Sequence, residues 1–139
     1  MPDRLYIDFE TRSAADLKKT GAWRYAEDPT TGVFCMAYAF NNEQTDIWVE
    51  GDPLPIRIRR HILDGGEVHA WNAMFELAIW TRICAVRFGW PQLLISQLRC
   101  TMAAAACQSA FKRDPVSASK KHPSLWLRRL ARAGPELSI

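Results

Sequence analysis

Short apolar segments of strand length recur along the first half of the chain and predict a β-sheet. Residues 4–10 are mainly apolar and carry two acids, and residues 33–40 form a nearly unbroken apolar run, typical of a strand buried on both faces. Residues 45–49 return after a turn at residues 41–43, and residues 67–71 form another short strand. These four segments are the predicted strands.

A capping-box pattern predicts the first helix. Ser13 is an N-cap type residue with Asp16 three positions later, and Gly21 supplies a stop signal. We therefore expect a short helix between Ser13 and Gly21. Residues 27–32 are rich in turn formers, so a turn-rich connection is expected to lead into the strand at residues 33–40.

Three further segments have helical character: residues 56–64, residues 72–88 and residues 100–111. In the first, Ile58 and Ile62 are four apart, which favours a helix, although the Ile-Arg-Ile alternation there also allows a strand. Asn72 is expected to cap the second helix. Residues 92–98 are expected to form a loop. This order of elements predicts an α/β domain with a mixed sheet covered by helices.

Composition narrows the class of protein. The 139 residues fit one domain, and 48% hydrophobic with 24% charged residues is an ordinary globular balance. Four cysteines without a CxxC pair argue against a zinc site and favour reduced thiols; His69 is expected to be a strand histidine rather than a ligand. No apolar stretch is long enough to span a membrane, and the first strand follows the N-terminus directly, so we expect a cytoplasmic protein.

The net charge of +3 is unevenly distributed. Residues 1–111 hold 11 Lys and Arg against 13 Asp and Glu, whereas residues 112–139 hold 7 against 2. We therefore expect a domain at residues 1–111 and a basic tail at residues 112–139 that is loosely ordered or binds a partner. The tail bases and Trp126 could follow a nucleic-acid strand, or could form a solvated or protein-facing segment in which residues 124–133 make a short amphipathic helix.

Three acids stand out by their positions. Asp8 and Glu10 are two apart on the first strand, so their side chains are expected on one face, where they repel each other unless a cation lies between them. Glu76 lies early in the helix that starts at Asn72 and could converge with them on Mg²⁺ or Mn²⁺. The alternatives are two solvated strand acids and an acid that interacts with the helix dipole.

Two strings carry a resemblance to a known family. Asp8-Phe9-Glu10-Thr11 resembles the first motif of the DnaQ-like (DEDD) 3′–5′ exonucleases, and Asn72-Ala73-Met74-Phe75-Glu76 resembles their second motif. The wider sequence resembles the N-terminal exonuclease region of bacteriophage-type family A DNA polymerases from residue 4 to about residue 106. The further strings that match in order are Asp16-Leu17, Gly21, Tyr25 to Pro29, His69 to Ala73 and Arg99 to Met102.

The resemblance implies a ribonuclease H-like fold and metal-dependent removal of nucleotides from single-stranded 3′ ends. Asp8 would bridge two Mg²⁺ or Mn²⁺ ions, Glu10 would hold the ion that activates water, and Glu76 would stand where the family usually has Asp. Thr11 and Phe75 would lie beside the terminal nucleotide, with Phe75 alternatively in the core. Asn72 would contact substrate or cap its helix.

The third motif of this family, a Tyr or His followed by Asp, is not found in the sequence. Beyond Glu76 the acids are Asp114 and Glu136, and no Tyr follows Tyr38. The resemblance thus predicts a domain incomplete at its C-terminal end. Without a general base the rate could fall by about 10²–10⁴-fold. Two hypotheses follow: a metal-dependent exonuclease-like domain, or an inactive nuclease-fold protein of phage or mobile-element origin that binds or inhibits a partner.

Overall fold

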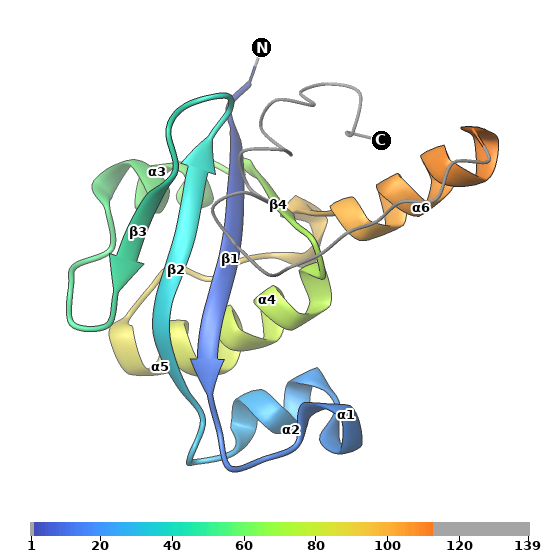
Figure 1. The fold of residues 1–139 in the computed structure, drawn as a ribbon. Coiled ribbons are helices and arrows are strands. Elements are labelled where there is room, and N and C mark those ends of the chain that lie inside the picture. The colour runs from blue at the N-terminus through green and yellow to red at the C-terminus, as the bar shows by residue number, and fades with distance from the viewer. Residues whose placement is uncertain (1, 113–139) are drawn as a thin grey trace.

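The computed structural model describes residues 2–112, which form a five-stranded mixed sheet flanked by helices (Figure 1). The sheet order is β3-β2-β1-β4-β5. The strands are β1 (Arg4–Arg12), β2 (Gly32–Phe40), β3 (Asp46–Val49), β4 (Glu67–Ala70) and β5 (Leu98–Cys100). The central strand β1 runs antiparallel to β2 and parallel to β4, so it contacts both halves of the sheet. The predicted α/β class with a mixed sheet is confirmed.

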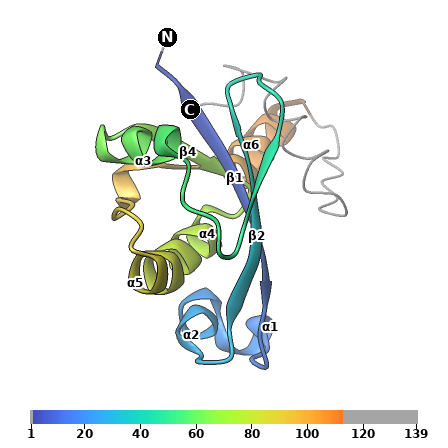
Figure 2. The same cartoon turned by 90° about the vertical axis from the view of Figure 1, so that its left-hand side faces the viewer.

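Most of the helices lie on one side of this sheet (Figure 2). The helical elements are α1 (Leu17–Thr20), α2 (Ala22–Glu27), α3 (Ile56–Leu63), α4 (Ala73–Ile79), the π-helical turn η1 (Trp80–Cys84), α5 (Ala85–Phe88), the 3₁₀ turn η2 (Ile95–Gln97) and α6 (Thr101–Lys112). Helix α6 extends away from the sheet beyond β5 (Figure 1).

Alternate residues of β1 supply the centre of the core. Leu5, Ile7 and Phe9 are all buried in one cluster with residues of α3 and η1. Ile58 and Ile62 of α3 belong to this cluster, which confirms the predicted helix and rejects the strand alternative for that segment. Because the apolar residues of β1 face the helices, the residues between them face the other side of the sheet.

An aromatic group fills the core beside the second half of β1. The ring of Trp90 lies 4.8 Å from those of both Trp48 and Trp80, and Phe9 packs against Trp80 and Trp90. The buried Trp80 indole also donates a hydrogen bond to the Pro91 carbonyl at 2.8 Å. These contacts fix β1 against the helix that follows β4.

Two short elements were not predicted. Strand β5 lies where the expected loop at residues 92–98 meets the expected helix at residues 100–111. Three residues are too few for a strand pattern to be recognised, and the strand forms by pairing with β4. Helix α2 lies between Gly21 and the expected turn-rich connection at residues 27–32; it is six residues long and is stabilised by burial of Tyr25 and Ala26. Both elements depend on tertiary contacts rather than on local pattern.

The expected capping residues are also corrected. Asp16, not Ser13, is the N-cap of α1, and its side chain accepts a hydrogen bond from the Lys18 amide. Ser13 instead contacts Thr31 through the two hydroxyl groups at 2.6 Å. Gly21 ends α1 as predicted, with a φ of 77° that favours glycine.

The long helix expected from Asn72 to Phe88 begins where predicted but differs in detail. Asn72 holds the N-cap position, yet its side chain makes no capping hydrogen bond. The helix also widens into the π-helical turn η1 before it continues as α5. The expectation of a strand buried on both faces at residues 33–40 is wrong at Phe34, which is 53% exposed beside a bulge in the β1–β2 pairing.

The expectations for the basic tail, including residues 124–133, Trp126 and Asp114, lie outside the described residues. Within the described part of the chain, no helix has the length and apolarity needed to cross a membrane.

The core contacts of η1 predict a large effect of truncation at Ile83. This side chain is fully buried, so Ile83→Ala is expected to lower the free energy of unfolding by about 2–5 kcal/mol in urea titrations. Val86, three residues later, is 74% exposed, so Val86→Ala is the matched control with an expected change within about 0.5 kcal/mol. Equal effects of the two variants would contradict the packing of this helix.

Candidate functional site: carboxylates beside the central strand

Strand β1 places Asp8 and Glu10 on the face of the sheet opposite the helical core. Ile7 and Phe9, the residues that alternate with them, are buried in that core. Cys35 pairs with Glu10 across the β1–β2 ladder. Burial raises the pKa of the Cys35 thiol, and the charges of Glu10 and Asp8 raise it further. Asp8 is only 3% exposed, whereas Glu10 is exposed.

Helix α4 brings the third acid to the edge of the same strand. The β1–β4 ladder ends at the pair Tyr6 and His69, so the Phe9 amide lies beyond the last strand pairing. Glu76 Oε1 accepts a long hydrogen bond from this amide at 3.5 Å, beyond the usual range of about 2.7–3.2 Å. Glu76 is fully buried. Its carboxylate therefore lies beside the backbone that joins Asp8 to Glu10.

The three acids are neighbours in the fold, but their side chains are not arranged as a finished metal site. Among residues 2–112, no group of three or more His, Cys, Asp or Glu side chains has the geometry to hold a metal ion. Three carboxylates nevertheless have the donor chemistry that Mg²⁺ and Mn²⁺ prefer. The donor set thus fits a hard divalent cation in its chemistry, and the Phe9–Glu76 contact places Glu76 beside the strand that carries Asp8 and Glu10.

Two of the other predicted site residues, Thr11 and Phe75, lie near the end of β1. The Thr11 and Tyr25 hydroxyl groups are 2.8 Å apart, and the Tyr25 ring lies 6.0 Å from that of Phe75. Phe75 is half-buried and packs against the core, whereas Asn72 is exposed. Thr11 and Phe75 therefore lie on either side of Tyr25. No local pattern in the sequence indicates a role for Tyr25, although it belongs to one of the matching strings.

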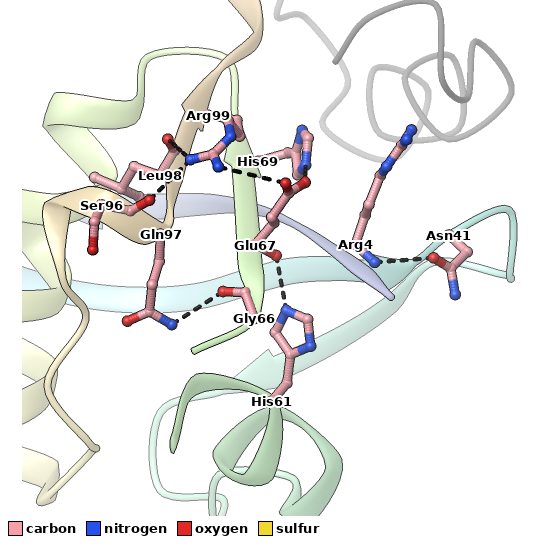
Figure 3. A network of polar contacts seen from close by, with 10 residues as sticks. All are labelled: Arg4, Asn41, His61, Gly66, Glu67, His69, Ser96, Gln97, Leu98 and Arg99. Carbon is pink, nitrogen blue, oxygen red and sulfur yellow. Dashed lines mark hydrogen bonds and ion pairs between the residues drawn. The ribbon is translucent and has the colours of Figure 1, made fainter. Parts of the chain in front are cut away.

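A separate polar network lies at the start of β4 (Figure 3). His69 is buried in β4, as expected, and its Nε2 lies 3.0 Å from a Glu67 carboxylate oxygen. Arg99 of β5 pairs with the other oxygen of that carboxylate at 3.4 Å. His61 Nε2 contacts the Glu67 carbonyl at 2.8 Å. This network ties α3, β4 and β5 together.

Comparison with known proteins gives one curated relative. Over 100 residues the chain is 35% identical to a DNA polymerase of Bacillus phage SP02. This relationship supports a polymerase-related domain. The alignment covers 70% of the chain but only 15% of the polymerase. Neither a family model nor a solved structure matches the chain.

Replacement of Glu76 tests whether its charge is needed by the fold. We expect Glu76→Gln to change the free energy of unfolding by no more than about 1 kcal/mol, because an amide oxygen can still accept from Phe9 and the side chain keeps its volume. We expect Glu76→Ala to lower it by about 2 kcal/mol, through a cavity and a lost acceptor. Urea titration checks both, and equal losses would show that the carboxylate charge is structural.

The pH dependence of stability is expected to follow His69. Burial lowers the pKa of His69 below its usual 6.5, and the opposing hydrogen bond and charge of Glu67 only partly offset this; Arg4 and Arg99 lower it further. As the pH falls, the unfolded chain binds a proton at His69 before the folded chain does. The contribution of neutral His69 to folding stability is therefore complete above about pH 6.5 and is lost as the pH falls below that value.

This dependence can be measured by urea titration between pH 7.5 and 5, in the wild type and in His69→Gln. Glu67 affects stability only at lower pH, because the hydrogen bond with His69 holds its pKa below the usual 4.5. The substitution should flatten the decrease in stability below pH 6.5. An NMR titration that gave His69 a pKa at or above 6.5 would contradict this prediction.

Proposed function

We propose that the chain is a 3′–5′ exonuclease-like domain that binds single-stranded nucleic acid at its 3′ end with a divalent cation. The observation that carries this proposal is the contact of the Glu76 carboxylate with the Phe9 amide, between Asp8 and Glu10. It brings an acid from a distant helix to the strand that carries the other two. A solvated pair of strand acids would not require a third, fully buried carboxylate there.

In this proposal Asp8, Glu10 and Glu76 hold Mg²⁺ or Mn²⁺. When bound, such ions supply charge stabilisation at the phosphate and activation of water. Thr11 and Phe75 would border the terminal nucleotide, since both lie at the end of β1 that carries the acids. Phe75 offers a half-buried ring against which a base could stack.

The phage relative supports a nucleic-acid-related role, because it is described as a DNA polymerase. The chain spans about 15% of the length of that relative, so we do not extend polymerase activity to it. The exonuclease proposal rests on the two sequence motifs and on the placement of Asp8, Glu10 and Glu76.

A second candidate function is binding without catalysis, by an inactive nuclease-fold protein that acts on a nucleic acid or a protein partner. It is favoured by the absence of a finished metal site among the described residues. It is also favoured by the sequence of residues 77–112, which contains no Asp or Glu that could serve as a fourth ligand. The basic tail, outside the described residues, would offer a surface for the partner.

A binding and cleavage experiment separates these functions. The purified chain is titrated with Mn²⁺, followed by electron paramagnetic resonance, and is incubated with a 5′-labelled single strand that has a free 3′ end. We expect Mn²⁺ binding and slow shortening from the 3′ end, about 10²–10⁴-fold below an enzyme with a general base. Both should be lost in Asp8→Asn.

The matched control is Asp46→Asn, which removes an exposed acid of β3 and should leave both readouts unchanged. Strand binding that is independent of Mn²⁺ and of Asp8, without shortening, would instead support the second candidate. If neither Mn²⁺ nor the strand binds, the first candidate is excluded, and the second is excluded as a nucleic-acid-binding protein.

A further inference from the structure

We propose that Tyr25 is a positioning residue that sets the spacing between the strand carrying Asp8 and Glu10 and the helix carrying Glu76. Its effect on cation binding rests on the proposed function, whereas its effect on the contact between strand and helix does not. Tyr25 belongs to α2, which contributes no acid to the candidate site. Its role would therefore be exerted entirely through its neighbours.

The side chain of Tyr25 contacts the residue next to Glu10 and the residue next to Glu76. Its hydroxyl lies 2.8 Å from that of Thr11, which directly follows Glu10 in β1. Its ring lies 6.0 Å from that of Phe75, which directly precedes Glu76 in α4, at an interplanar angle of 46°. One side chain therefore links the end of β1 to the first turn of α4.

The backbone of Tyr25 is held independently of this hydroxyl. The Thr31 hydroxyl donates to the Tyr25 carbonyl at 2.6 Å, and the Ser13 hydroxyl contacts that of Thr31 at 2.6 Å. Arg87 of α5 donates to the Thr31 carbonyl at 2.8 Å. Because these contacts hold α2 without the Tyr25 hydroxyl, that hydroxyl can be removed while the helix stays in place.

Simple core packing is the competing explanation, since Tyr25 is only 8% exposed. The two explanations differ in what the hydroxyl does. If Tyr25 only fills space, Tyr25→Phe should behave like the wild type, because the ring is retained. If Tyr25 positions β1, loss of the hydroxyl should loosen the end of that strand relative to α4 while the rest of the sheet is unaffected.

The test measures amide hydrogen exchange at Phe9, whose amide donates to Glu76, in the full chain. In Tyr25→Phe we expect exchange at Phe9 to be about 2- to 10-fold faster, the range of one net hydrogen bond. Amides in the β1–β4 ladder should change by less than about twofold. Thr11→Val should reproduce this selective effect, and Thr11→Ser, which keeps a hydroxyl, should retain slow exchange.

The matched control is Tyr38→Phe, which deletes the hydroxyl of another partly buried tyrosine, in β2, and should leave Phe9 exchange unchanged. In a Mn²⁺ titration of the same variants, Tyr25→Phe should weaken binding by about 2- to 10-fold. Unchanged Phe9 exchange in Tyr25→Phe, or equal acceleration at every amide, would overturn the proposal. A wild type that binds no Mn²⁺ would refute the proposed function, and Phe9 exchange would still decide the role of Tyr25.

Discussion

The contact between the Phe9 amide and the Glu76 carboxylate joins the central strand to the helix after β4, and the candidate site depends on it. It exists because β4 stops at Ala70, which leaves the second half of β1 without a strand partner on that side. A buried backbone amide needs an acceptor, and here a carboxylate from a residue 67 positions away supplies one. The same group thus satisfies the fold and contributes to the site.

The elements around this contact have different functions. The aromatic cluster of Phe9, Trp80 and Trp90 packs on the helical side of the strand, opposite Asp8 and Glu10. The α1–α2 segment lies at the far end of β1, where Tyr25 contacts both the strand and the helix. The acids themselves come from β1 and α4. Side chains that are fixed by packing and by hydrogen bonds can hold neighbouring polar groups in a defined arrangement.

Much of this arrangement could be predicted from sequence, where the signal is local. The i and i+2 spacing of Asp8 and Glu10 was sufficient to place both on one face, because Ile7 and Phe9 had to enter the core. The helix at residues 56–63 followed from the spacing of Ile58 and Ile62. The position of Glu76 early in its helix suggested that it could converge with the other two acids, and the motif resemblance supported this. Its contact with the Phe9 amide could not be predicted, since no local pattern shows that a helix residue will reach a strand amide.

The remaining features depend on contacts between distant segments. Strand β5 has three partly exposed residues and exists because β4 offers an open edge. Helix α2 is too short for its periodicity to be recognised, and it is fixed by burial of Tyr25 and Ala26. Asn72 was expected to cap its helix because of its residue type, but its side chain makes no such bond. In each case tertiary structure decides what local propensity leaves open.

The wide turn η1 has a consequence for how relatives of this chain should be aligned. A π-helical turn contains one residue more than an α-helical turn, so it arises most simply by a single insertion within a helix. A relative with a regular helix in this place would have one residue fewer between Trp80 and Cys84. The gap in such an alignment belongs inside the helix, and moving it to the loop after Gly89 would shift the buried residues out of register.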